Sequence, residues 1–104
     1  MLNTLADLSC VERQRRYADS VPFVHVPSEL ACQWEQYSSL LREQAWFRDS
    51  LSPNELAATT NFDTKFKVFC DSFNHILPDF DQLWRDPRWL EIGLAASKTL
   101  QAFE

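Results

Sequence analysis

Apolar side chains recur at intervals of four and three residues in the second half of the chain. The positions are Phe62, Phe66, Phe69, Phe73 and Ile76. This spacing places all five on one face of an α-helix. Burial of each Phe side chain contributes roughly 1.5–3 kcal/mol. The pattern therefore predicts a central helix over 61–76, whose aromatic face forms much of the core.

Two further segments carry helical stripes of the same kind. The helix of the first segment is expected to begin after a Ser28 cap and to end near Arg48 or Asp49. Its stripe is Leu30, Trp34, Tyr37, Leu41 and Ala45. The second stripe is Trp89, Ile92, Gly93, Ala96, Leu100 and Phe103. Because Gly93 and Ala96 are small, another helix can approach closely there, and we expect the predicted central helix to pack against this one.

The N-terminal segment has a thinner apolar face. Thr4 stands three residues before Asp7, which is the spacing of a weak capping box, so a helix is expected from Thr4 to about Ala18. Its apolar positions are Leu5, Leu8 and Val11. The first half of this helix is therefore predicted to pack, and the second half to be solvated.

Prolines mark the starts of other helices. The segment Ser52-Pro53-Asn54-Glu55 combines a capping serine, a proline at the first helical position and a glutamate that can reach back to the cap. Asp86-Pro87 repeats the cap and the proline, and Asp79 is expected to cap a short helix that reaches Trp84. These signals predict three helix starts in the second half of the chain.

Residues 20–28 differ in character because they contain two prolines. Pro22 and Pro27 push their preceding residues toward extended geometry, so an extended strap is expected at about 20–28. The chain has a single glycine, which disfavours tight hairpins and phosphate-binding loops. The sequence thus predicts an all-α fold, a compact bundle of four to five helices with this strap, in one domain over residues 1–104.

Net charge and cysteine content limit the partners and the cellular compartment that can be expected for this protein. The net charge is −5, which disfavours binding to nucleic acids and to anionic membranes. No apolar run approaches the roughly 18 residues of a membrane span, and the N-terminus does not resemble a signal peptide. Cys10, Cys32 and Cys70 are odd in number and form no CxxC motif. We therefore expect a cytoplasmic protein with free thiols and no membrane contact.

Soft metal ligands are sparse. The histidines, His25 and His75, and the cysteines show no close metal-ligand spacing, although Cys32, Cys70 and His75 can meet in space. No segment carries a catalytic signature, so we predict no cofactor, no metal site and no catalytic residue. A helical enzyme or cofactor-binding protein is kept as a third hypothesis.

Tryptophan and arginine gather at two predicted helix ends. These are the residue types most enriched in interface hot spots. The leading hypothesis is a non-enzymatic protein–protein interaction module, such as an accessory subunit, an inhibitor or immunity factor, or a small assembly chaperone. The predicted partner-binding residues are Trp46, Phe47, Trp84, Arg85, Arg88 and Trp89.

The sequence also suggests an alternative binding patch and an alternative function, and it leaves a homodimer open. The densest basic cluster is Arg13, Arg15 and Arg16. This alternative patch suits an acidic partner or a phosphate. Residues 51–69 have the rhythm of a helix-turn-helix, with Asn61 at the turn and with Lys65 and Lys67 on the second helix. A small DNA-binding regulator is therefore the alternative hypothesis, although the net charge opposes it. A homodimer is also compatible with the sequence.

Overall fold

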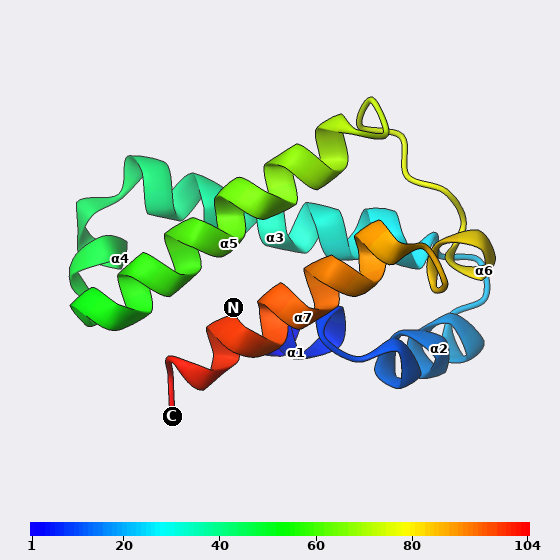
Figure 1. The fold of residues 1–104 in the computed structure, drawn as a ribbon, viewed down its shortest axis with the longest axis horizontal. Helices are drawn as coiled ribbons and strands as arrows, with labels where there is room; N and C mark the ends of the chain where they lie inside the picture. Colours follow the sequence, from blue (N-terminus) through cyan, green and yellow to red (C-terminus); the bar gives the residue numbers. More distant parts are fainter.

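The computed structural model describes residues 1–104 and contains helices without any strand, which confirms the all-α prediction. From α2 onward, short helices alternate with long ones along the chain (Figure 1). The elements are α1 (Leu2–Leu8), α2 (Val11–Ser20), α3 (Val26–Glu43), α4 (Ala45–Asp49), α5 (Pro53–Asp71), α6 (Phe80–Leu83) and α7 (Pro87–Gln101). No helix combines the length and the apolar character that crossing a membrane requires.

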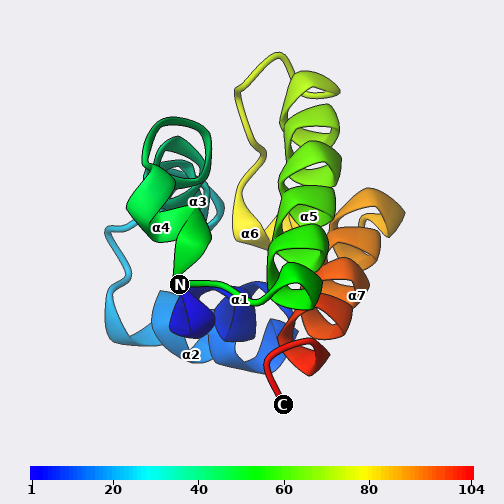
Figure 2. The same cartoon turned by 90° about the vertical axis from the view of Figure 1, so that its left-hand side faces the viewer.

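The long helices α5 and α7 lie side by side and run in opposite directions (Figure 1). Helix α1 contacts both α7 and α3, so it closes the base of the molecule, with the α3–α4 arm on one side and the α5–α7 pair on the other (Figure 2). The short helix α4 lies at one end of the molecule, whereas α2 and α6 lie at the other end (Figure 1). The core fills the space between α1, α3, α5 and α7.

The predicted aromatic stripe forms the centre of the core, but only in part. Phe62, Phe66 and Phe69 are buried on α5, and their rings contact one another in sequence. Phe73 is half-buried beyond the helix end, and Ile76 is 80% exposed, so the prediction is wrong for Ile76. The reason is that the helix ends at Asp71, and Asn74 and His75 then take positive φ angles of 54° and 63°. This turn changes the phase of the chain, and Leu77 is buried instead.

Helix α5 is also longer at its start than the pattern predicts. The expected break before Asn61 is absent, because one continuous helix runs from Pro53 to Asp71. The poor helix former Thr59 is accommodated by burial and by a hydrogen bond from its Oγ1 to the Glu55 carbonyl oxygen. The predicted Ser52 capping box is confirmed, since the Ser52 hydroxyl accepts from the Glu55 N–H and the Glu55 carboxylate accepts from the Ser52 N–H.

The predicted N-terminal helix is divided into α1 and α2 by a break at Ser9 and Cys10. Thr4 is not its cap: it is buried within α1, and its Oγ1 donates to Gln33 Oε1 on α3. The first half packs as expected, but the second half is solvated only in part, because Tyr17 and Ala18 pack against the core. Gln14 on α2 is only 1% exposed.

Gln14 joins three segments of the chain. Its Nε2 donates to the carbonyl oxygens of Asp7 and Leu8, at 2.8 Å and 3.2 Å, where α1 ends. Its Oε1 accepts a 2.9 Å hydrogen bond from Trp89 Nε1 on α7. One buried amide therefore bonds two carbonyls at the end of α1, of which that of Asp7 also accepts from the Cys10 N–H, and the indole N–H of a core tryptophan.

The segment around residues 20–28 is shorter and less extended than predicted. Only Val21–His25 lies outside a helix, and it forms a turn, because Pro27 sits in the first turn of α3, where its missing N–H leaves no bond unmade. His25, rather than Ser28, caps this helix: its Nδ1 accepts from the Ser28 N–H at 3.2 Å. At its other end α3 stops at Glu43, and the residues expected to extend it form the separate helix α4.

The predicted start and close packing of α7 are confirmed. The Asp86 carboxylate accepts from the Arg88 N–H at 2.8 Å, and Pro87 follows the cap. At Gly93, an added Cβ would lie 3.2 Å from the Leu8 carbonyl oxygen, so the glycine allows α1 to approach α7. Asp79 precedes α6 as expected, although its side chain makes no capping hydrogen bond.

Candidate functional site

The residues predicted to bind a partner do not form one surface. Trp89 is only 1% exposed and donates to Gln14, so its assignment to a surface is wrong: it belongs to the α7 stripe, which faces the core. Trp46 and Phe47 lie on α4, at the opposite end of the molecule from α6 (Figure 1). Trp84 and Arg85 follow α6, and Arg88 lies in the first turn of α7.

Trp46 and Phe47, which we call the α4 pair, are adjacent residues on one short helix. Trp46 is 64% exposed, and its ring meets the half-buried Phe47 edge-on at 5.8 Å between centroids. Arg48 on the same helix donates to the carbonyl oxygens of Leu41 and Arg42, which fastens α4 to the end of α3. The α4 pair is therefore an exposed aromatic group whose neighbouring arginine is already bonded within the chain.

The junction residues and the alternative basic patch meet in space. The guanidinium carbon of Arg15, on α2, lies 5.2 Å from the centroid of the Trp84 ring and 5.4 Å from that of Phe80. The guanidinium carbon of Arg85 lies 4.9 Å from the centroid of the same Trp84 ring. Two sites that the sequence suggests separately thus share one tryptophan. We call Arg15, Trp84 and Arg85 the arginine–tryptophan surface.

Arg15 and Arg85 differ from the other arginines because they have no polar partner within the chain. Arg13 pairs with Asp7, Arg16 with Glu12, Arg42 with Glu35 and Arg88 with Asp86, while Arg48 donates to main-chain carbonyls. Neither Arg15 nor Arg85 has a carboxylate within ion-pairing distance, and neither donates a hydrogen bond within the chain. Their only specific contacts are with aromatic rings, so both guanidinium groups keep their N–H donors available.

Arg88 is close to Arg85 in sequence, but its guanidinium group is paired with a carboxylate. Its side chain forms two hydrogen bonds with the Asp86 carboxylate, at 3.2 Å and 2.9 Å, and its guanidinium carbon lies 3.8 Å from the Phe73 ring centroid. The side-chain hydrogen bond from Arg88, followed by that from its backbone N–H, lowers the pKa of the Asp86 carboxyl. Arg88 therefore stabilises the start of α7, where its charge is already neutralised.

Acidic side chains flank the arginine–tryptophan surface. A hollow of about 410 Å³ between α2, the turn before α3 and α6 is lined in part by Asp19, Asp79 and Asp81. His25 also lines it, and its Nε2 lies 3.3 Å from Asp79 Oδ1. The positive surface is consequently small, with carboxylates on the neighbouring side.

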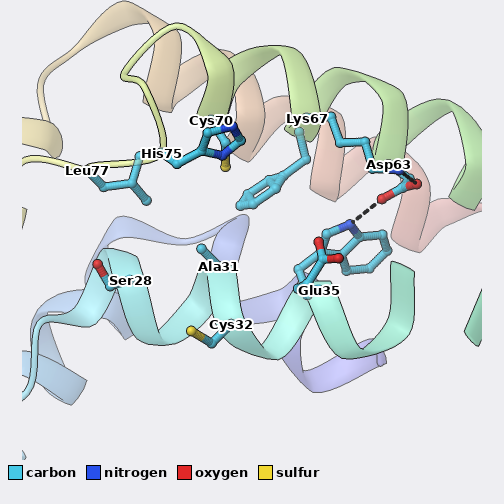
Figure 3. A pocket seen from close by; sticks show the side chains of 11 residues that line it. Ser28, Ala31, Cys32, Glu35, Asp63, Lys67, Cys70, His75 and Leu77 are labelled. Atoms are coloured by element: carbon cyan, nitrogen blue, oxygen red, sulfur yellow. Dashed lines mark hydrogen bonds and ion pairs between the residues drawn. The ribbon is translucent and has the colours of Figure 1, made fainter. Parts of the chain in front are cut away.

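A second hollow, which the sequence pattern does not reveal, lies between α3 and α5 (Figure 3). This groove measures about 290 Å³, and apolar side chains of Ala31, Trp34, Phe66 and Leu77 line much of it. Trp34 Nε1 donates to Asp63 Oδ1 at 3.0 Å across the groove, and Lys67 Nζ lies 3.2 Å from Asp63 Oδ2. The charges at this end of the groove therefore neutralise one another.

The groove also brings together the soft ligands that the sequence separates. Cys32, Cys70 and His75 all line it, as Figure 3 shows, yet no group of three or more side chains is arranged to hold a metal ion. His75 Nε2 pairs with Asp71 at 2.9 Å. Burial, together with the charges of Asp71 and Glu35, raises the pKa of the Cys70 thiol to about 11. A thiol in this environment is a poor nucleophile at neutral pH.

Cys70 is accordingly expected to react with iodoacetamide at least about tenfold more slowly than Cys32 at about pH 8, because its thiolate is scarce and Cys32 is exposed. Peptide mapping by mass spectrometry over a labelling time course measures both rates. In a denaturant the two rates should converge. Equal rates in the folded protein would contradict the assignment of Cys70 as an unreactive thiol.

The helix-turn-helix alternative lacks its structural basis. It requires a turn near Asn61, whereas α5 is continuous there. Lys67, one of its two basic residues, is paired with Asp63. Lys65 is exposed and is the single unpaired basic residue of this segment, although Lys98 of α7 lines the same small hollow. Residues 51–69 therefore present neither the turn nor the positive face that this motif needs.

Comparison of the chain with protein-family models, with curated proteins and with solved structures gives no match.

Proposed function

We propose that this protein is a non-enzymatic protein–protein interaction module that binds its partner through the arginine–tryptophan surface. Accessory subunits, inhibitors or immunity factors, and small assembly chaperones are the classes of protein that act in this way. The observation that carries the proposal is that Arg15 and Arg85, alone among the arginines, have no partner within the chain and converge on one half-buried tryptophan.

Physical arguments support this surface over the other exposed groups. Trp and Arg contribute large free energies at interfaces, because the ring offers area and the guanidinium offers several donors. Binding normally costs about 0.5–1.5 kcal/mol for each flexible side chain that is immobilised. Contact of both arginines with Trp84 restricts them before a partner arrives, so less of this cost is left for binding.

The free cysteines favour a reducing compartment. All three cysteines are free thiols, and Cys32 is exposed. Exposed free thiols persist where glutathione and thioredoxin keep them reduced, so we propose that the module works in the cytoplasm.

Replacing both Arg15 and Arg85 with Gln is expected to reduce partner capture from the native lysate by at least about tenfold, because hot-spot residues commonly contribute 2 kcal/mol or more. Affinity capture followed by quantitative mass spectrometry compares this variant with the parent. Arg16→Gln is the matched control, since Arg16 is adjacent on α2 and already paired with Glu12. Capture of the same proteins in the same amounts by the double variant would refute the surface, and far-UV circular dichroism establishes that the variants are folded.

A further inference from the structure

We infer that the arginine–tryptophan surface recognises carboxylates on an acidic segment of the partner protein. This inference rests on the proposed function and adds the chemistry of the partner to it. The two guanidinium groups of Arg15 and Arg85 carry full positive charges and unused N–H donors.

The distance between the two guanidinium groups limits how far apart two bound carboxylates can lie. Both guanidinium carbons lie about 5 Å from the Trp84 ring centroid, at 5.2 Å and 4.9 Å, so they are no farther apart than the sum of these distances. Acidic side chains at positions i and i+4 of a helix have Cβ atoms about 5–6 Å apart, and their flexible ends can spread farther. Two carboxylates of one short segment can therefore reach both arginines at once.

The chemistry of the donors fits carboxylates well. A guanidinium group presents its N–H donors at its edge in a planar fork, which matches the two oxygens of a carboxylate. A guanidinium that contacts an aromatic ring through its face keeps these edges free. Arg15 and Arg85 both lie over the Trp84 ring, and each can accept one carboxylate there.

The charge around the surface argues against a nucleic acid. Binding to a nucleic acid usually neutralises several phosphates along a continuous basic track. Here the neighbouring arginines are paired with acids, and Asp19, Asp79 and Asp81 line the adjacent hollow. With a net charge of −5, the protein would repel a long polyanion beyond the two free arginines. A short segment with two carboxylates avoids this repulsion.

The test is an NMR titration of the ¹⁵N-labelled protein, which detects weak binding through the Trp84 indole N–H signal, assigned with Trp84→Phe. The probes are an Ala-rich helical peptide with Glu at i and i+4, the same peptide with Gln at both positions, and oligothymidylate. We expect the Glu peptide to shift the Trp84 signal and to lose at least about tenfold in affinity in the Arg15→Gln, Arg85→Gln double variant. Arg16→Gln should leave its affinity within about twofold, because Arg16 is paired already.

Three outcomes would overturn the inference: equal binding of the Gln peptide, tighter binding of oligothymidylate, or unchanged affinity in the double variant. These outcomes are distinct from a failure of the proposed function. If the double variant loses its partner from the lysate while the Glu peptide does not bind, the carboxylate chemistry is refuted and the interaction surface stands. If the Glu peptide binds as expected while partner capture is unchanged, the carboxylate site stands and the proposed function is refuted.

Discussion

Replacing Trp34 with Ala is expected to lower the free energy of unfolding by about 3–5 kcal/mol, since truncation of a buried tryptophan leaves a large cavity. The Trp34 side chain is 2% exposed, and its ring meets Phe62 edge-on at 4.7 Å between centroids. It also donates the 3.0 Å hydrogen bond to Asp63, a carboxylate that would then depend on Lys67 alone. For a domain stabilised by about 5–15 kcal/mol in total, this loss is a large fraction.

Urea unfolding followed by far-UV circular dichroism measures the effect, because this signal does not depend on the tryptophan that is removed. Trp46→Ala is the matched control: the same residue type is lost, but Trp46 is 64% exposed, so a change within about 0.5 kcal/mol is expected. Similar losses in the two variants would contradict the central position that the structure gives to Trp34.

Gln14→Leu is expected to cost about 3 kcal/mol, although leucine has a similar size and is more hydrophobic. The substitution leaves the Trp89 N–H and the Leu8 carbonyl oxygen without their partner, whereas the Asp7 carbonyl oxygen keeps its bond from the Cys10 N–H. Each buried polar group that loses its hydrogen bond costs about 1–3 kcal/mol. The same urea experiment measures this loss, and Gln36→Leu, at an exposed position of α3, is the control with a change close to zero.

Gln14→Glu separates the hydrogen bonds from the shape of the side chain. A carboxylate there would face the two carbonyl oxygens of α1, so burial beside them raises the pKa of the introduced acid in the folded state. A group with a raised pKa contributes its stability at low pH and loses it as the pH rises. The variant should therefore be closer to the parent in acid than at neutral pH, and a pH-independent difference would contradict this account.

Most of the features that could be predicted correctly depend on neighbours in the sequence. The buried stripe of Phe62, Phe66 and Phe69 follows from helical spacing, and the Ser52 and Asp86 caps follow from local hydrogen-bond geometry. Burial of Gln14 could not be predicted in this way. It stands in a polar run on α2, and its environment depends on Trp89, which is distant in sequence.

In the candidate site, too, the residue types could be predicted from local sequence, but their contacts across the fold could not. Local composition drew attention to Arg15 and to Trp84 as members of two unrelated groups, because nothing in the spacing indicates that α2 meets the end of α6. The groove between α3 and α5 gave no local signal, since its lining comes from two helices and the turn after α5. A cluster of Trp and Arg in the sequence does not indicate which of these side chains are buried. Trp89 was therefore assigned to the surface, although it is buried.

The hydrogen bond between Gln14 and Trp89 has a consequence for the synthesis of the chain. Helix α1 packs on α7, and the amide of Gln14 finds its indole partner only there. Ribosomes add about 5–20 residues per second, so α1 and α2 emerge several seconds before α7 exists. During this interval Leu5 and Leu8, buried in the finished fold, have no α7 to cover them. The contacts that bury these two leucines against α7 can therefore form only after the rest of the described chain has been made.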